Sequence, residues 1–431
     1  MTAGIRIANA HSRGAAPQDR LDTPDGGSLN TTGPASRTET RRVLIVSPQP
    51  FYEDRGTPIA VRELVRALAA MGLRVDLATF PVGETVEIAG VQIVRTPNPF
   101  RFRRIPIGFS LRKLVLDVLL FFTVYRLLRT ERYFSVHGVE EGGYIAVLLG
   151  RPAGVPVIYE MQSSLTHQMR LHWPFRNRIA QRVLQVCERW LIARVDLVAC
   201  SAGLSDTVRA MDPAVPIREW AYPVMPAATT EQADVESLRR DLGIAQGARV
   251  VVYAGTFETY QGLREVVEAI PRVSAEVPGT VFVLVGAERT GAARVERQAK
   301  RLGLNGNLRI VPRRPLAEIA HYHALADVLL APRALGRNLP LKLFHYMASG
   351  RAIVATGVQP GSPVLQQDLA LVTEHCPAGI ADAVITLLRD PWRAAALAAR
   401  ARSFAKERLD PTHFQGAVRE ICHAVSGTAP L

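Results

Sequence analysis

The chain has 431 residues, of which 48% are hydrophobic and 21% are charged. This length favours two or three domains, and the composition is typical of a globular protein with a substantial core. It excludes a mainly disordered, fibrous or disulfide-framework protein, because the four cysteines are few and far apart. The formal net charge of +13 indicates an anionic partner, such as phosphate groups, nucleic acid or an acidic membrane surface.

Residues 1–41 differ in composition from the rest of the chain. They are rich in Gly, Pro, Ser, Thr and Asp and contain no apolar run of the kind found in a secretory signal. We therefore expect residues 1–41 to be a disordered tail. In the rest of the chain we expect the four cysteines to be reduced, as in a cytoplasmic protein.

A first α/β domain is expected over residues 42–222. Short apolar runs typical of buried parallel strands alternate with segments of helical periodicity. The expected strands are 43–46, 74–79, 134–136, 155–159 and 195–199, and the expected helices are 61–71, 143–149 and 178–193. The apolar segment 114–128 is too short to span a bilayer of ~30 Å and is interrupted by Asp117, so we expect a core helix.

A second α/β domain is expected over residues 248–390, after a linker at 223–247 and before a helical segment at 391–431. Its expected strands are 249–253, 280–285, 308–311, 328–331 and 352–355, and its expected helices are 263–273, 294–302, 319–326 and 340–349. The pattern predicts two doubly wound, Rossmann-like domains that face each other across a cleft, with ligands at the carboxyl ends of the strands.

The start of helix 340–349 is expected to bind an anion. Asn338 is a credible N-cap, Pro340 suits the first turn and Gly350 suits the left-handed position at the end. The free N–H groups of such a helix start favour a negative charge, and three cations lie around it: Arg333, Arg337 and Lys342. A diphosphate between these cations is the natural candidate, and a solvated basic loop is the alternative.

The same stretch carries a family resemblance. Residues 339–350 (LPLKLFHYMASG) followed by 351–356 (RAIVAT) resemble the donor-binding helix of retaining GT-B glycosyltransferases of the family-4 type. Residues 253–262 (YAGTFETYQG) look like the family's first nucleotide-binding loop, and 326–332 (ADVLLAP) look like its Ala-Asp-Val strand. The resemblance covers residues 42 to about 425 and implies transfer of a sugar from a nucleotide-sugar donor.

The chain departs from the family at the positions that hold the donor. Arg337 and His345 stand where the family pattern has two glutamates, the second of which binds the ribose hydroxyls. Thr256 and Gln261 stand where the family has the Arg and Lys that grip the diphosphate. Either the cationic clamp has moved to the helix side, which we favour, or donor binding is weak or absent.

Loops of the first domain add further candidates for the site. Arg55 and Gly56 precede its first helix, in the loop that in the family helps to hold the donor phosphates and the acceptor. His137 is expected at the cleft end of strand 134–136, where it matches a His near the reacting sugar in similar enzymes, so it is the catalytic candidate. Glu140 and Glu160 are candidates for binding acceptor hydroxyls. Packing, capping or solvated roles remain alternatives for these side chains.

The resemblance implies front-face attack with retention. The leaving diphosphate takes the proton of the acceptor, and cations stabilise the developing charge. No Asp-x-Asp occurs in the chain, which argues against the metal-dependent GT-A class, so neither a metal nor another cofactor is expected.

Basic residues concentrate in two segments of the first domain. Residues 101–132 hold eight basic and two acidic side chains, and residues 170–194 hold six basic and one acidic side chain, with aromatic residues interleaved. This pattern suits the surface of an anionic bilayer, while no motif for nucleic acid is present. A general contribution to solubility is the alternative.

The sequence thus predicts a metal-independent, retaining glycosyltransferase, peripheral on the inner face of the membrane. Its acceptor would be lipid-linked or a saccharide, in glycolipid or cell-surface polysaccharide synthesis. A catalytically weak or inactive GT-B scaffold subunit and, less favoured, a sugar-nucleotide epimerase are the alternatives.

Overall fold

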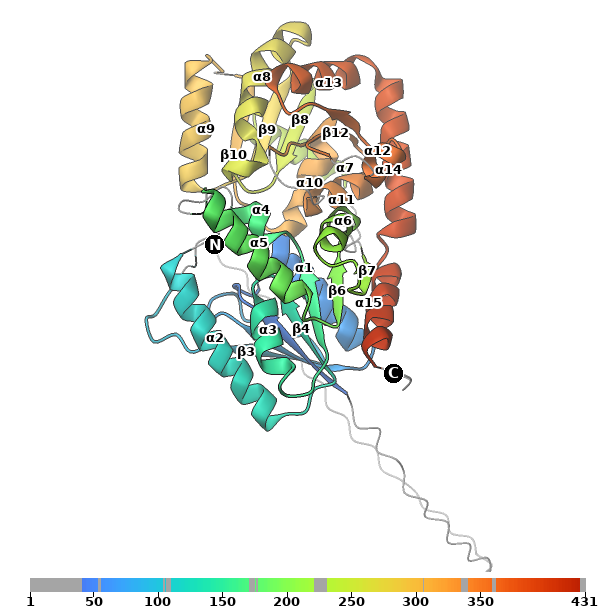
Figure 1. The fold of residues 1–431 in the computed structure, drawn as a ribbon. Coiled ribbons are helices and arrows are strands. Elements are labelled where there is room, and N and C mark those ends of the chain that lie inside the picture. Colours follow the sequence, from blue (N-terminus) through green and yellow to red (C-terminus); the bar gives the residue numbers. More distant parts are fainter. Residues whose placement is uncertain are drawn as a thin grey trace, which may run out of the picture. The chain divides into compact units, whose positions relative to one another are not determined.

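The computed structural model describes residues 41–52, 56–103, 105, 110–169, 175, 177–220, 231–304, 306–334, 340–358 and 362–426. All of them belong to one compact unit, Thr40–Leu431. Within these ranges the chain forms two parallel sheets with helices packed against them, as the sequence predicted (Figure 1). The fold is therefore α/β with two doubly wound sheets.

The N-terminal sheet has seven parallel strands in the order β3-β2-β1-β4-β5-β6-β7. They are β1 (Arg42–Ser47), β2 (Arg74–Thr79), β3 (Val91–Arg95), β4 (Ser135–Val139), β5 (Val157–Met161), β6 (Leu197–Cys200) and β7 (Ile217–Glu219). The helices of this part are α1 (Gly56–Ala70), α2 (Leu111–Thr130), α3 (Gly142–Gly150), α4 (Leu165–Met169), α5 (Arg178–Ile192) and α6 (Ala202–Met211). The strand order reverses between β1 and β4, and such a switch point opens a ligand crevice at the carboxyl ends of the strands.

The C-terminal sheet has six parallel strands in the order β10-β9-β8-β11-β12-β13. They are β8 (Val250–Ala254), β9 (Val281–Ala287), β10 (Leu308–Pro312), β11 (Val328–Ala331), β12 (Ala352–Thr356) and β13 (Leu371–Thr373). The helices are α7 (Gln232–Asp241), η1 (Thr259–Gln261), α8 (Leu263–Glu276), α9 (Arg289–Arg301), α10 (Leu316–Leu325), α11 (Leu341–Ser349), α12 (Pro363–Gln366), α13 (Pro377–Arg389), α14 (Pro391–Arg408) and α15 (Pro411–Val425). Here the switch point lies between β8 and β11.

Helix α15 packs against the N-terminal sheet, although the chain reaches it from the C-terminal sheet. It contacts α1, β6 and β7, and Phe414, Val418 and Ile421 are buried in one cluster with Ile45 of β1 (Figure 1). The rings of Trp220 and Phe414 stack with their centroids 5.0 Å apart. The final helix therefore completes the hydrophobic core of the first part of the chain.

Three sequence-based expectations about elements need correction. Segment 223–247 was expected to be a linker, yet it contains α7, whose Val235 and Leu238 pack on the core of the C-terminal sheet. Strand 134–136 is β4 and continues to Val139. The segment expected to be a core helix is α2, and only one side of it is buried. On the other side, Leu111 and Phe122 are 76% and 62% exposed.

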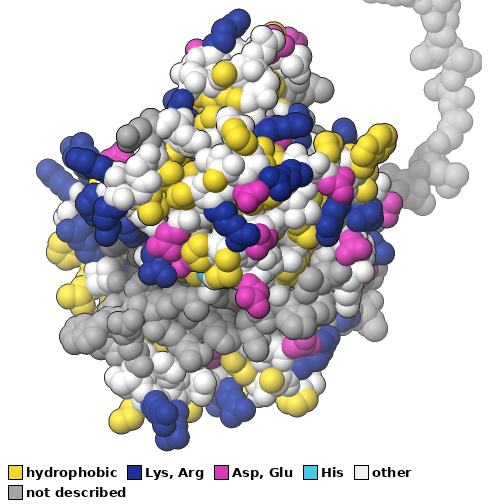
Figure 2. Space-filling model, turned by 90° about the horizontal axis from the view of Figure 1, so that it is seen from above, with side chains coloured by type: hydrophobic (Ala, Val, Ile, Leu, Met, Phe, Trp, Pro, Cys, Tyr) yellow, Lys and Arg dark blue, Asp and Glu magenta, His cyan; other side chains and the backbone are white. Residues whose placement is uncertain are grey.

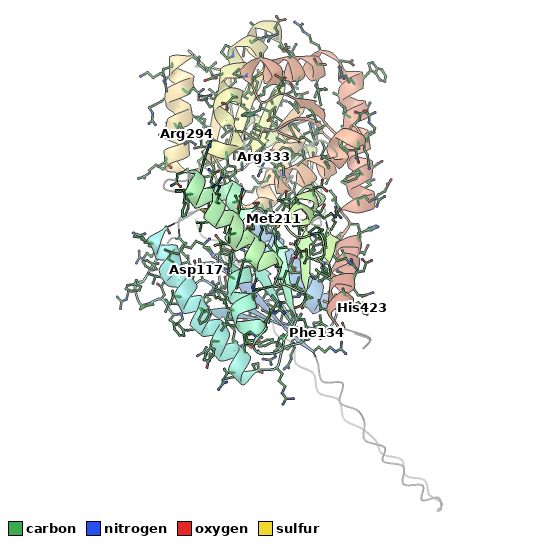
Figure 3. The ribbon with its side chains drawn as sticks, viewed as in Figure 1. Asp117, Phe134, Met211, Arg294, Arg333 and His423 are labelled. Atoms are coloured by element: carbon green, nitrogen blue, oxygen red, sulfur yellow. The ribbon has the colours of Figure 1, made fainter. Side chains whose placement is uncertain are left out.

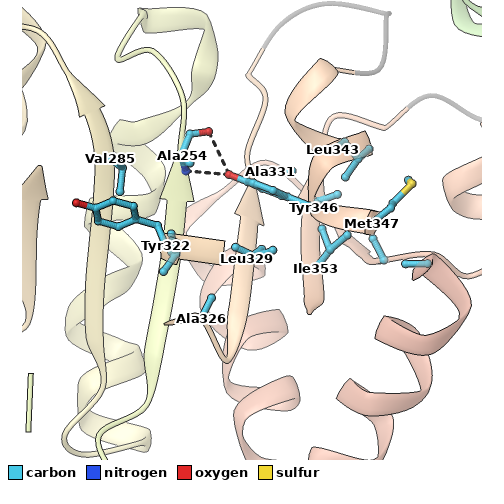
Figure 4. Close-up of a cluster of buried hydrophobic side chains, with 14 of the residues drawn as sticks. Ala254, Val285, Tyr322, Ala326, Leu329, Ala331, Leu343, Tyr346, Met347 and Ile353 are labelled. Carbon is cyan, nitrogen blue, oxygen red and sulfur yellow. Dashed lines mark hydrogen bonds between the residues drawn. The ribbon is translucent and has the colours of Figure 1, made fainter. Parts of the chain in front are cut away.

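Tyr346 of α11 ties that helix to strand β8 (Figure 4). Its side chain is buried, and its hydroxyl accepts a hydrogen bond from Ala254 N at 2.8 Å and donates one to Ala254 O at 3.1 Å. A buried backbone amide that loses its partner costs about 1–3 kcal/mol. We expect Tyr346→Phe to lower the free energy of unfolding by that amount in urea denaturation, while the exposed Tyr125→Phe on α2 leaves it unchanged.

Candidate functional site

The switch point between β8 and β11 brings together the loops that the sequence singled out. The loop after β8 runs from Gly255 to Gly262, and Arg333 follows β11 directly. Gly262 has φ 73°, and a Cβ there would lie 2.1 Å from Cε1 of His375, so the turn requires glycine. The helix after β11 is α11, and Gly350 takes the left-handed conformation at its end, as expected. Its N-cap is Pro340, which was expected in the first turn. Asn338, the expected N-cap, lies outside the described residues.

Lys342, in the first turn of α11, reaches across to the loop after β8. Its Nζ donates a hydrogen bond to Gln261 Oε1 at 2.8 Å and lies 4.1 Å from the centre of the Tyr253 ring. A Cβ on Gly255 would lie 2.9 Å from this Nζ, so glycine leaves the room that the ammonium group uses. Burial, and secondly the charge of Arg333, hold the pKa of Lys342 well below its usual value. Among the hydrogen bonds and ion pairs of the described residues Lys342 has no carboxylate partner, so a bound anion would favour its charged form.

Arg333 supplies a second cation at the same edge of the sheet (Figure 3). Its backbone N–H donates to Thr356 Oγ1 at 2.9 Å, and its guanidinium lies 5.9 Å from the centre of the Tyr260 ring. Burial lowers the pKa of this side chain. Arg337, the third predicted cation, lies outside the described residues.

Thr256 and Gln261 lie in the same loop and contact each other. Gln261 is buried, and its Nε2 donates to Thr256 Oγ1 at 3.4 Å, while Tyr253 donates from its hydroxyl to the Thr256 carbonyl at 2.6 Å. The structure therefore brings Thr256, Gln261 and Lys342 together. Sequence reasoning missed Tyr253, whose ring supports the ammonium group, although its place at the end of β8 could have indicated this role.

His345 lies on α11 with its imidazole enclosed. Its Nε2 is buried and has no hydrogen-bond partner among the described residues. Burial, and secondly the positive charge of Arg62, lower its pKa to about 4. The ring is therefore neutral near pH 7 and can accept at most one hydrogen bond from a ribose hydroxyl.

The structure corrects the expected position of His137. Because β4 continues to Val139, His137 lies within the strand and not at its end, and its side chain is 0% exposed. Its Nδ1 lies 2.7 Å from Oε1 of Glu160, which is also 0% exposed. Beside His137 in register are Ile45 and Ile158, which belong to the core under α15. The two candidates thus form an enclosed pair, and their roles towards substrate stay predictions.

Glu140 occupies the carboxyl end of β4 that had been assigned to His137. Its backbone has φ 50°, an unusual value for a residue with a side chain. Both of its carboxyl oxygens lie near Ser163 Oγ, at 3.0 and 3.1 Å. Burial, and secondly the charge of Glu141, raise the pKa of Glu140 to about 8. Near pH 7 this carboxyl group is therefore mostly protonated and can donate as well as accept a hydrogen bond.

The loop before α1 is described only in part. Arg55 lies outside the described residues. Gly56 is the first residue of α1, it is exposed, and a Cβ there would contact nothing within 4 Å. Its backbone geometry therefore does not demand glycine. Within the described ranges there is no group of three or more His, Cys, Asp or Glu side chains that could hold a metal ion.

Comparison with known proteins decides the family. The model "Glycosyl transferase 4-like domain" matches residues 55–220, and "Glycosyl transferases group 1" matches residues 248–390, so together they cover more than half of the chain. The chain belongs to the GT-B glycosyltransferases of the family-4 type. The order of the two models follows the order of the two sheets.

Relatives and solved structures agree with this family. A D-inositol 3-phosphate glycosyltransferase of Catenulispora acidiphila is 26% identical over 379 residues, 83% of this chain and 89% of that protein. The alignment with a protein of the same description from Xylanimonas cellulosilytica is shorter, with 27% identity over 48% of this chain and 49% of that protein. Sucrose-phosphate synthase from Thermosynechococcus elongatus shares the fold, with a TM-score of 0.75, 19% identity and coverage of 88% of this chain and 98% of that one.

Proposed function

We propose that this family member transfers a sugar, with retention, from a nucleotide-sugar donor to a saccharide or lipid-linked acceptor. The observation that carries the proposal is the position of Lys342 Nζ, 2.8 Å from Gln261 Oε1 at the switch point of the C-terminal sheet. The family's glycosyltransferase models on both sheets and the relatives named D-inositol 3-phosphate glycosyltransferase support this class of reaction.

The proposal requires that the cationic clamp has moved from the loop to the helix. Gln261 replaces the loop lysine of the family pattern, and the Lys342 ammonium group of α11 reaches the Gln261 side chain. Arg333 adds its positive charge near Lys342, and that charge, after burial, lowers the pKa of Lys342. A diphosphate between them would restore favourable charge pairing, because an anion at a helix start and two cations attract each other.

This arrangement also suits the chemistry of the transfer. As the bond between the sugar and the diphosphate breaks, negative charge develops on the leaving phosphate, and fixed cations stabilise it. In front-face attack the phosphate oxygen takes the proton of the acceptor hydroxyl, so the protein needs no nucleophile of its own. The cations stabilise the negative charge of the leaving phosphate, as a metal ion does in other transferases. The proposal therefore includes neither a metal nor another cofactor.

On the acceptor side we assign Glu140 to a hydroxyl group of the acceptor. Its carboxyl group lies at the carboxyl end of β4, next to the strand-order reversal, and is held by Ser163. The neutral form can donate to an acceptor oxygen and accept from an acceptor hydroxyl. These steps use neither His137 nor Glu160, whose side chains are both 0% exposed, and the roles of these two residues towards substrate stay predictions.

The pKa of Glu140 gives this assignment a pH signature. With a pKa of about 8, the carboxyl loses its proton as the pH rises through 8, and kcat/KM for the acceptor should then fall roughly 10-fold per pH unit. Glu140→Gln keeps a neutral amide of the same shape, so we expect near-normal activity at pH 7 and no alkaline fall. An alkaline fall that persists in the Gln variant would come from another group and would contradict this role of Glu140, whereas a wild-type rate that rises through pH 8 would show that the ionised carboxylate is needed.

We place this activity at the cytoplasmic surface of a membrane, in glycolipid or cell-surface polysaccharide synthesis. Within the described parts of the chain, none of the helices combines the length and the apolar character that a bilayer crossing requires. The basic segments of the first domain favour attachment to an anionic surface.

Titration of the full chain with UDP- and GDP-sugars tests the proposal against its main alternative. We expect binding of at least one donor at micromolar to millimolar concentration, followed by product formation with a saccharide or lipid acceptor. Absence of binding at millimolar donor would favour a non-catalytic scaffold, and conversion of the donor without transfer would favour epimerisation.

A further inference from the structure

Large apolar side chains are exposed on three neighbouring helices of the first domain. Of the thirteen large hydrophobic side chains that are exposed in the described parts of the chain, ten lie on α2, α3 and α5. Exposed apolar residues scattered singly need no explanation, but a concentration on adjacent elements marks an interaction surface. We call the exposed sides of α2, α3 and α5 the apolar face.

On each of the two long helices the exposed apolar residues form one stripe. On α5 they are Ile179, Val183 and Val186, at positions i, i+4 and i+7, with exposed fractions of 76%, 56% and 65%. On α2 the stripe runs from Leu111 through Val118 to Phe122. Residues at such spacing share one side of a helix, so each helix turns a continuous apolar stripe outwards.

The two stripes are joined by α3. Helix α3 contacts both α2 and α5, and the three helices are neighbours in Figure 1. Lys113 of α2 forms an ion pair with Glu141 just before α3, with 2.6 Å between Nζ and Oε1. The rings of Tyr144 of α3 and Trp190 of α5 stack at 6.3 Å. The exposed apolar residue of this joining helix is Leu148, which is 51% exposed.

The exposed charged side chains on α2 and α5 themselves are all basic, although Glu131, directly after α2, is exposed too. Over residues 111–130 and 178–192, all of which the structure describes, no acidic side chain is exposed: Asp117 is partly buried on α2 (Figure 3) and Glu188 is fully buried on α5. The exposed charged residues of these helices are Arg112, Arg126, Arg129, Arg178, Arg182 and Arg189. By contrast, the face seen from above in Figure 2 mixes basic with acidic side chains.

An open hollow at the junction of α3 and α5 also combines apolar and basic side chains. It measures about 620 Å³ and is lined by Leu148, Trp190, Arg151 and Arg194 among others. The Arg194 guanidinium lies 4.7 Å from the centre of the Trp190 ring. A lining that combines apolar side chains with two guanidinium groups fits an anionic headgroup whose acyl chains lie beside the helices.

We propose that the apolar face inserts its stripes into the interface of an anionic lipid bilayer, with the arginines on the lipid phosphates. The occupant is a bilayer because the apolar stripes lie beside exposed arginines, with no exposed carboxylate on α2 or α5, and so complement both the acyl chains and the anionic headgroups. A second copy of this face would set arginines against arginines, which opposes self-association. The inference deepens the proposed function, since it commits the acceptor to the membrane surface.

Vesicle sedimentation with the full chain tests this proposal. We expect binding to vesicles of phosphatidylcholine with phosphatidylglycerol, weaker binding at high salt, and little binding to phosphatidylcholine alone. The double variant Phe122→Glu with Val183→Glu should bind about 10-fold more weakly, because it places carboxylates in both stripes. Trp392→Glu, at an exposed apolar residue of α14, is the matched control and should leave binding unchanged.

Charge reversal supplies a second, independent variant. Arg182→Glu with Arg189→Glu on α5 should weaken binding to anionic vesicles, whereas Arg297→Glu with Arg301→Glu, both exposed on α9, should have little effect. Equal binding to neutral vesicles, equal effects of test and control variants, or a dimer that the stripe variants dissociate would overturn the proposal. Donor titration of the same variants separates the membrane proposal from the proposed glycosyl transfer. We expect the variants to lose vesicle binding and keep their affinity for the donor, because the apolar face is not part of the donor site.

Discussion

Replacing Lys342 with alanine should weaken nucleotide-sugar binding by roughly 5- to 150-fold, about 1–3 kcal/mol, without unfolding the chain. The change removes the ammonium group that reaches Gln261 Oε1 and leaves the diphosphate with less positive charge. Lys342 lies in the first turn of α11, and its side chain is only partly buried, so we expect the helix to persist in the variant. Isothermal titration of the donor, with circular dichroism as a check of folding, measures the effect.

A charge swap makes this test specific. Lys342→Gln combined with Gln261→Lys returns the cation to the loop while keeping one amide and one ammonium group in contact. We expect the double variant to recover much of the affinity that Lys342→Gln loses. Lys300→Ala, at an exposed position of α9, is the matched control for net charge. Unchanged donor affinity in Lys342→Ala would remove this lysine from the proposed clamp.

Glu160→Ala should lower the free energy of unfolding by about 3–5 kcal/mol. Glu160 and His137 form a hydrogen-bonded pair at 2.7 Å, and both side chains are fully enclosed between the N-terminal sheet and its core. Burial raises the pKa of Glu160, while the contact with His137 opposes that rise. Removing the carboxyl leaves a buried imidazole without its partner and opens a cavity. Urea denaturation followed by circular dichroism measures the loss.

Two further variants identify the cause of this effect. Glu407→Ala, at an exposed glutamate of α14, should change the unfolding free energy by less than about 0.5 kcal/mol. The double variant His137→Leu with Glu160→Leu fills the site with apolar atoms and should be less destabilised than Glu160→Ala alone. A small effect of Glu160→Ala would mean that the pair is not enclosed in solution, and would favour the catalytic prediction for His137.

Strands and the two-sheet architecture could be predicted because buried parallel strands are short continuous apolar runs. The expected range 74–79 coincides with β2, and 328–331 coincides with β11. Helix α7 was missed because its apolar residues, such as Val235 and Leu238, are sparse among charged ones, and a tertiary contact decides their helical state. Strands β3 and β7 were also missed, since Val91–Arg95 and Ile217–Glu219 contain polar residues at an edge of the sheet.

The site was harder to predict than the fold. The loop and helix were found from their sequence pattern, but the contact of Lys342 with Gln261 joins residues that are 81 positions apart. Local periodicity cannot reveal such a contact. His137 was misplaced because the strand was expected to end at residue 136, whereas β4 continues to Val139. The exposed stripe of α2 was misread, because apolar residues on both sides of a helix do not show which side the core covers.

The most direct test of the central claim is a crystal structure of the full chain with a nucleoside diphosphate bound. We expect a phosphate oxygen within hydrogen-bond distance, about 3 Å, of Lys342 Nζ, with Arg333 beside it and the contact of Lys342 with Gln261 lengthened or shared. Diphosphate density elsewhere, with Lys342 still hydrogen-bonded to Gln261 alone, would contradict the proposed clamp.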